Sequence, residues 1–148
     1  MGYFWSRELQ SITRAYYKNS VCAIIIYDIT NRVSFEYVNN WIEDIKNSSK
    51  KNIMIVLVGN RKELEKRREV TYEEGKELAD KNGISLFYEI YEKNVENINN
   101  IFYEYVNMID KKIGEGYYNL DENWGIKCGF EKNVIKMNEK VNKKCLLI

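Results

Sequence analysis

The chain has 148 residues, of which 45% are hydrophobic and 30% are charged, a composition typical of one globular domain. Its 23 basic and 22 acidic residues give a formal net charge of +1, so no overall field favours nucleic acid as a partner. Histidine is absent, which removes the commonest general base and metal ligand. The cysteines form no C-x-x-C pair, and no apolar run reaches the roughly 20 residues that span a bilayer.

Strands and helices are predicted to alternate along the chain. Residues 21–27 and 53–58 are continuous apolar runs rich in β-branched side chains, typical of parallel strands buried on both faces. Between the two runs, apolar residues recur at three- and four-residue spacing and predict one helical stripe, formed by Phe35, Val38, Trp41, Ile42 and Ile45. A helix long enough to cross between parallel strands completes a β-α-β unit.

The second half of the chain continues the alternation. Thr71 and Glu74 have the spacing of a capping box, which predicts a helix over about 72–82 that Gly83 ends. Residues 85–89 are a third candidate strand, and helical spacing resumes at Ile98, Ile101, Phe102, Tyr105, Val106 and Ile109. The pattern predicts an α/β fold, a parallel sheet with flanking helices. We expect one domain over 1–113 and a flexible tail over 114–148.

In such a sheet, ligands bind to the loops that leave the carboxyl ends of the strands. The loop after 53–58 reads N-R-K-E from Asn60 to Glu63 and resembles the guanine-reading N-K-x-D motif of GTPases. In that motif an amide faces the O6 and N7 side of the purine, and a carboxylate accepts from N1–H and the 2-amino group. By position, Asn60 and Glu63 take these roles, while Arg61 replaces a lysine. The bland alternative is a charged strand-to-helix loop.

Several ordered segments resemble small GTPases of the Rab type, within the Ras superfamily. Residues 11–17 (SITRAYY) are similar to the Rab switch II helix, 27–30 (YDIT) to the end of its fourth strand, and 41–44 (WIED) to the segment that follows. Residues 67–75 and 115–127 are similar to the Rab-two subgroup, which serves traffic between endoplasmic reticulum and Golgi. The resemblance covers about 7–129 and implies a partial P-loop GTPase fold.

The departures from this family concern the phosphates and the base. The chain contains no G-x-x-x-x-G-K-[ST] loop, and Ser6 stands where Rab proteins have the water-positioning glutamine. The resemblance therefore implies no catalytic residue for GTP hydrolysis and no Mg²⁺ site. The second base-reading motif, E-T-S-A-K in the family, reads E-I-Y-E-K here, so Tyr91 and Glu92 add bulk and negative charge and only Lys93 matches. We expect GTP and GDP binding to be weak or lost.

Two explanations fit these departures. Either the protein begins upstream of Met1, or the chain is a remnant of a GTPase that no longer uses nucleotide. The altered loops around residues 60–63 and 89–93 favour the remnant, because a miscalled start would leave those downstream motifs intact. Without the family's first strand, residues 21–27 would form an exposed apolar edge that invites association.

The last four residues, from Cys145 to Ile148, fit the prenylation signal C-a-a-X. A basic run precedes this signal and supplies the second element that one lipid chain needs for stable attachment: Lys132, Lys136, Lys140, Lys143 and Lys144. The alternative is a solvated lysine tail that ends in aliphatic residues by chance. Rab-two proteins end in two cysteines, so this ending departs from the subgroup and leaves the type of prenyl group open.

The resemblance also implies partners and a location. The switch II helix contacts effectors in Rab proteins, and here it would display Arg14, Tyr16 and Tyr17. The expected location is the cytoplasmic face of endoplasmic reticulum and Golgi membranes. The sequence thus predicts a Rab-like protein of vesicle traffic, and the rival hypothesis is a membrane-anchored interaction module that works without nucleotide.

Overall fold

The computed structural model describes residues 20–49, 53–91 and 93–118. Three parallel strands, β1 (Cys22–Asp28), β2 (Met54–Asn60) and β3 (Leu86–Glu89), form one sheet in the order β1-β2-β3. The register places Ile24 beside Val56 and Val58 beside Tyr88. The predicted strands and their parallel direction are confirmed.

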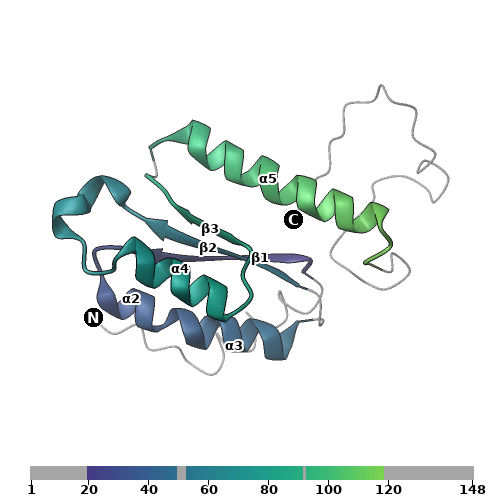
Figure 1. Cartoon of the computed structure of the whole chain (residues 1–148), viewed down its shortest axis with the longest axis horizontal. Coiled ribbons are helices and arrows are strands. Elements are labelled where there is room, and N and C mark those ends of the chain that lie inside the picture. The colour runs from purple at the N-terminus through teal and green to yellow at the C-terminus, as the bar shows by residue number, and fades with distance from the viewer. Residues whose placement is uncertain (1–19, 50–52, 92, 119–148) are drawn as a thin grey trace.

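Helices cover both faces of the sheet (Figure 1). Helices α2 (Arg32–Glu36), α3 (Val38–Ser48) and α4 (Tyr72–Lys81) lie on one side, and α5 (Val95–Gly114) lies on the other. A 3-10 helix, η1 (Lys62–Arg67), follows β2. Two apolar clusters result: one joins α3 and α4 to the first face, and the second joins α5 to the opposite face. The sheet is therefore the middle of three layers.

The crossover between β1 and β2 is two helices instead of the single predicted one. The break is slight, because Tyr37 between them keeps right-handed helical angles, with φ −71° and ψ −14°. The Asn31 side chain caps α2 by accepting from the Ser34 amide. The predicted stripe survives the break, since Val38 and Ile42 are fully buried against the sheet.

Helix α4 has the ends that the sequence predicts. The Thr71 hydroxyl accepts from the Glu74 amide, and the Glu74 carboxylate accepts from the Thr71 amide at 2.8 Å, which completes the capping box. Gly83 takes a φ of +70° just beyond the helix, a conformation that a residue without Cβ adopts at little cost.

Strand β1 departs from the prediction that it is buried on both faces. The exposed fractions of Ile24 and Ile26 are 37% and 61%, whereas β2 is buried along both faces. The reason is the position of α5, whose buried residues pack on Met54, Val56 and Val58 of β2 and on Leu86 of β3. A continuous apolar run indicates a hydrophobic strand, but it does not show how much of that strand a neighbouring helix covers.

The packed region reaches slightly past the predicted domain boundary at residue 113. Tyr118 is 2% exposed and belongs to the apolar cluster that α5 forms with the sheet. Residues 119–148, which hold most of the predicted tail, the lysine run and Cys145, lie outside the described residues. No helix of the described ranges combines the length and the apolar character needed to cross a membrane.

Candidate functional site

The loops that leave the three strands meet at the carboxyl edge of the sheet, as expected for a parallel α/β fold. The Ile29 amide donates to the Asn60 carbonyl at 3.1 Å, which joins the first loop to the second. The Lys62 amide donates to the Ile90 carbonyl at 3.0 Å, and the Ile90 amide donates to the Gly59 carbonyl at 2.8 Å. These bonds place the two predicted base-reading segments side by side.

Asn60 and Arg61 take a strained turn at the end of β2. Arg61 has a φ of +68°, in the left-handed region that costs a non-glycine residue about 1 kcal/mol or more. The Asn60 side-chain oxygen accepts from the Arg61 amide at 2.8 Å, which stabilises that turn. The Arg61 guanidinium reaches Asp28 at the end of β1, with 3.3 Å between Nε and Oδ2.

Asp28 also organises its own loop. One carboxylate oxygen accepts from the Thr30 amide at 2.8 Å and from the Thr30 hydroxyl at 2.7 Å. The other oxygen faces Arg61, so Asp28 links the β1 loop to the β2 loop. Sequence reasoning missed this role; the available signal was a carboxylate at the carboxyl end of a strand.

The remaining predicted base-reading residues lie nearby, with one exception. Glu63 is exposed in the first turn of η1, and Lys93 is exposed in the loop between β3 and α5. Tyr91 is partly buried, and its carbonyl accepts from the Asn94 amide at 2.9 Å, just before α5 begins. Glu92 lies outside the described residues, as do Arg14, Tyr16 and Tyr17 of the predicted effector surface.

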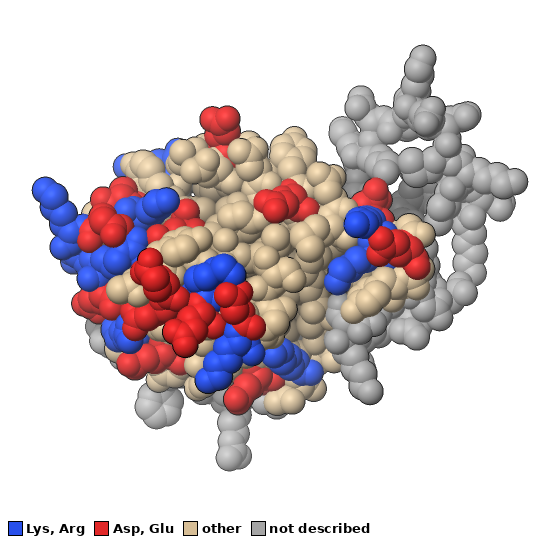
Figure 2. Space-filling model, in the orientation of Figure 1, with Lys and Arg blue, Asp and Glu red and all other residues tan. Residues whose placement is uncertain are grey.

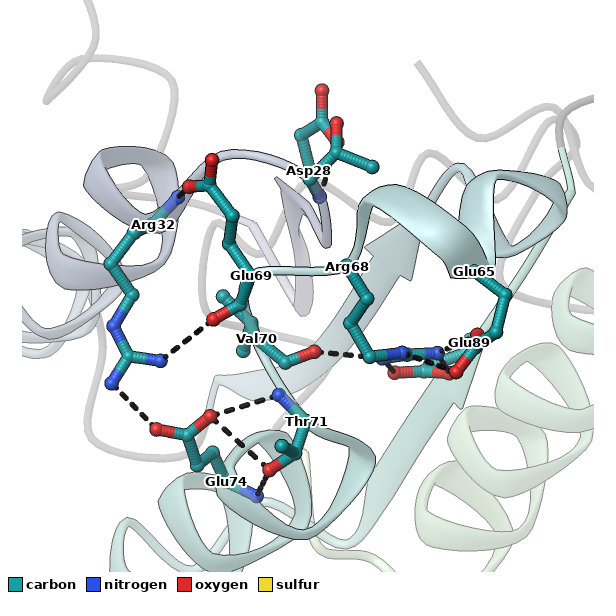
Figure 3. A network of polar contacts seen from close by, with 10 residues as sticks. Asp28, Arg32, Glu65, Arg68, Glu69, Val70, Thr71, Glu74 and Glu89 are labelled. Carbon is teal, nitrogen blue, oxygen red and sulfur yellow. Dashed lines mark hydrogen bonds and ion pairs between the residues drawn. The ribbon is translucent and has the colours of Figure 1, made fainter.

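Arg68 ties η1 to the end of β3 (Figure 3). Its guanidinium donates to both oxygens of Glu89, at 2.6 and 2.8 Å, and to both oxygens of Glu65, at 2.8 and 2.6 Å. It also donates to the Val70 carbonyl at 2.8 Å. The Glu89 side chain is only 2% exposed, so the carboxylate of this ion pair is buried. Hydrogen bonds to Glu89 and then Glu65 raise the pKa of Arg68 further above its usual value.

A second charged network fastens the start of α4 to α2. Arg32 donates to Glu74 at 2.5 Å and to the Glu69 carbonyl at 3.2 Å, while its amide donates to the Glu69 carboxylate at 2.8 Å. The hydrogen bond from Arg32, helped by the Thr71 amide, lowers the pKa of Glu74 to about 2. Charged side chains of both signs are interspersed over η1 and α4, at the left of Figure 2. Because these groups are exposed, the network adds little to stability.

The acidic and cysteine side chains of the described residues form no metal-binding cluster. No group of three or more Asp, Glu or Cys side chains within 20–49, 53–91 and 93–118 could hold a metal ion. Asn60, Glu63 and Lys93 stand on adjacent loops at the carboxyl edge of the sheet. The backbone of residues 60–62 thus lies beside the backbone of residue 90, and the reading of a base by these loops stays a prediction.

Comparison with known proteins tests the family resemblance. The family model of the Ras family matches residues 6–111. The Ras-related protein Rab-2B of Dictyostelium discoideum is 43% identical over 106 residues, which make up 72% of this chain and 52% of that protein. The chain thus spans about half the length of this curated relative. The match covers β1 to β3 and most of α5, so the sheet and its loops are those of the family. The chain belongs to the Ras family of small GTPases and is of the Rab type within that superfamily.

Proposed function

We propose that this chain is a membrane-attached, Rab-like protein of vesicle traffic at endoplasmic reticulum and Golgi membranes, with guanine-nucleotide binding that is weakened or lost. Membership of the Ras family and similarity to a Rab-2 protein support the trafficking role. The observation that carries the proposal is the pair of base-reading loops, which stand side by side but hold altered residues.

The altered residues act on the base in three ways. Glu63 is one methylene longer than the aspartate of the family, so its carboxylate must fold back to accept from N1–H and the 2-amino group. Arg61 is engaged with Asp28, which holds its guanidinium at the β1 loop and away from the purine face that the family lysine covers. Tyr91 replaces a small residue where a backbone amide has to approach O6 closely. Each change reduces the hydrogen bonding that separates guanine from other bases.

The residues expected to bind the phosphates also support weakened nucleotide binding. A P-loop holds the β- and γ-phosphates through backbone amides and a lysine, and its hydroxyl binds Mg²⁺. The 148 residues contain no G-x-x-x-x-G-K-[ST] sequence, and Ser6 is too short to orient an attacking water as glutamine does. We therefore propose that these 148 residues supply neither the phosphate-binding loop nor the water-positioning side chain that GTP hydrolysis needs.

We expect no GDP or GTP to co-purify with the 148-residue chain, because its base-reading residues are altered and its 148 residues contain no phosphate-binding loop. Fluorescent-GDP titration with and without Mg²⁺ should show no saturable binding up to high micromolar protein, while circular dichroism verifies that the protein is folded. Glu63→Asp should not restore binding, since it repairs one base contact only. Glu73→Asp, the same change on exposed α4, is the matched control. Saturable, magnesium-dependent binding at micromolar or lower concentration would show that nucleotide use is retained.

The carboxyl-terminal segment carries the proposed membrane attachment. A prenyl chain on Cys145 contributes about 0.8 kcal/mol per buried methylene, and each nearby lysine adds about 1 kcal/mol near an anionic leaflet. We expect Cys145→Ser to move the full chain from the membrane to the soluble fraction of its cell, whereas Cys128→Ser should leave it membrane-bound. Replacing Lys140, Lys143 and Lys144 with glutamine should weaken binding at low salt and have less effect at high salt.

Mass spectrometry of the chain from its own cell provides the direct test of that anchor. The expected species lacks residues 146–148 and carries a lipid on Cys145. An unmodified Cys145 thiol followed by intact Leu146, Leu147 and Ile148 would rule the anchor out.

The second candidate function is a membrane-anchored interaction module that acts without nucleotide. The replacement of a small residue by Tyr91 favours it, because that change blocks the base without removing the effector-facing segment that contains Arg14, Tyr16 and Tyr17. The two candidates differ in one measurable respect. Partner binding that stays the same with GDP, with GTP and without nucleotide supports the module, and binding that requires GTP supports the GTPase.

A further inference from the structure

The 3-10 helix η1 and its two flanking residues concentrate positive charge. Residues 61–68 contain five lysines and arginines and two glutamates, whereas the whole chain has a formal net charge of only +1. Figure 2 shows blue side chains projecting at the left end of the molecule, where Figure 1 places η1. This segment is therefore a local basic surface on a chain without an overall field.

Two of the five cations fix the segment to the sheet. The Arg61 Nε lies 3.3 Å from a carboxylate oxygen of Asp28, at the end of β1. Arg68 donates to Glu89 at the end of β3 and to Glu65 within η1. These ion pairs hold both ends of η1, so the segment keeps its shape before a partner binds and loses little freedom on binding.

The other three cations have no acidic partner. Lys62, Lys66 and Arg67 are exposed, and none of them forms an ion pair with a carboxylate in the described part of the chain. Glu63 is likewise unpaired among the described residues, while the other glutamate of η1 is bound by Arg68. Three free cations against one free carboxylate leave an excess of positive charge on the exposed surface of η1.

The position of η1 in the fold separates this surface from the outer side of β1. Strands β1 and β3 are the two outer strands of the described sheet. A strand from an earlier part of the chain would add beside β1, whereas Arg68 ties η1 to β3, the opposite outer strand. The exposure of the three free cations therefore does not depend on whether the outer side of β1 is covered.

We propose that η1 is a membrane-contact surface on which Lys62, Lys66 and Arg67 bind the anionic headgroups of phospholipids. The contact rests on the proposed function, because it needs a chain that is held at an anionic leaflet. A lysine or arginine near such a leaflet strengthens binding by about fivefold, and the lysine run before Cys145 supplies a second contact with the same surface. Two linked contacts with one surface reinforce each other.

The shape and the backbone of η1 favour a lipid surface over an acidic protein segment. An extended peptide binds by pairing with a strand edge, and an amphipathic helix binds in an apolar groove. The backbone of η1 is helical, and its one apolar residue, Leu64, is partly buried. The segment projects at one end of the molecule, so it can approach a flat bilayer (Figure 1).

The test is co-sedimentation of the full 148-residue chain, prepared without a lipid, with vesicles of phosphatidylcholine that do or do not contain phosphatidylserine. The chain should bind only the vesicles with phosphatidylserine, and less as salt rises. The combined variant Lys62→Gln, Lys66→Gln and Arg67→Gln should bind about tenfold more weakly or worse, since each cation contributes about fivefold. The absence of a lipid keeps this result independent of whether Cys145 is prenylated in the cell.

The matched control removes three exposed cations from α4 and α5 and changes the net charge equally: Lys76→Gln, Lys81→Gln and Lys111→Gln. Lys76 and Lys111 already pair with Asp80 and Glu115, so this variant should bind within about twofold of the parent chain. Circular dichroism verifies that both variants are folded. Equal losses in the two variants, or no binding of the parent chain to phosphatidylserine, would overturn the proposal. A polyglutamate peptide that binds the parent chain more tightly than the vesicles do would assign the surface to an acidic protein and overturn it as well.

Discussion

Replacing Arg68 with alanine is expected to lower the free energy of unfolding by about 3–5 kcal/mol, the usual cost of leaving one member of a buried ion pair alone. The Arg68 side chain is 14% exposed and the Glu89 side chain 2% exposed, so water replaces the lost bonds of Glu89 only in part. The Val70 carbonyl also loses a donor. The total free energy of unfolding of a small domain is only about 5–15 kcal/mol. The variant should therefore unfold at a much lower urea concentration than the parent chain, as followed by circular dichroism.

Two further variants separate the ion pair from general damage. Glu65→Ala removes an exposed carboxylate from the same guanidinium, and we expect a loss of less than about 1 kcal/mol. Arg68→Met combined with Glu89→Leu removes both charges together and should recover most of the stability lost in Arg68→Ala. Equal losses for Arg68→Ala and Glu65→Ala would show that Glu89 is not the partner that matters.

Gly75→Ala is expected to lower the free energy of unfolding by about 2–3 kcal/mol through overpacking. An added Cβ would stand 2.4 Å from the Tyr27 hydroxyl oxygen and 2.6 Å from a ring carbon of Phe87. The Tyr27 ring packs on Phe35, with 5.0 Å between centroids, and the Phe87 ring packs on Tyr72 of α4 at 5.2 Å, so neither ring is free to turn aside. Helix α4 would therefore have to move away from the sheet.

Tyr27→Phe should raise the free energy of unfolding, in contrast to Gly75→Ala. The Tyr27 hydroxyl is buried and has no hydrogen-bond partner among the described residues. Burial, with the charge of Glu89 second, raises the pKa of the phenol well above its usual range. Removing this unsatisfied group should raise stability by about 1 kcal/mol and reduce the cost of Gly75→Ala, because the closest clash disappears. Urea denaturation of the two single variants and the double variant measures this coupling. Additive effects would mean that the hydroxyl is not what α4 meets.

Local signals predicted the elements well. Both ends of α4 depend on contacts within a few residues, the capping box of Thr71 and Glu74 and the positive φ of Gly83. A short stretch of sequence is therefore enough to predict them. The neighbouring base-reading segments were equally predictable, because parallel strands bring their following loops to one edge. Asn60, Glu63 and Lys93 are on the two loops at this edge, and their role toward a base stays a prediction.

What could not be predicted depends on contacts between distant residues. Arg68 and Glu89 are 21 positions apart, and nothing local distinguishes that pairing from a pairing of Arg67 with another carboxylate. The exposure of Ile24 and Ile26 was predicted wrongly for the same reason, since it follows from how far α5 extends across the sheet. Arg61 pairs with Asp28 from a left-handed turn, a conformation that the residue type alone does not indicate.

The buried Tyr118 side chain limits how far the residues after it can extend from the domain. Because this side chain is 2% exposed in the cluster under α5, the chain is fastened to the domain there and not at the end of the helix. Cys145 comes 27 residues later in the sequence. At about 3.3–3.6 Å per residue, even a fully stretched chain would put this cysteine no more than about 90–97 Å from Tyr118. A lipid on Cys145 would therefore keep Tyr118 within that distance of the bilayer. The domain, with its nucleotide-type loops and strand β1, could bind a partner only in this layer next to the membrane.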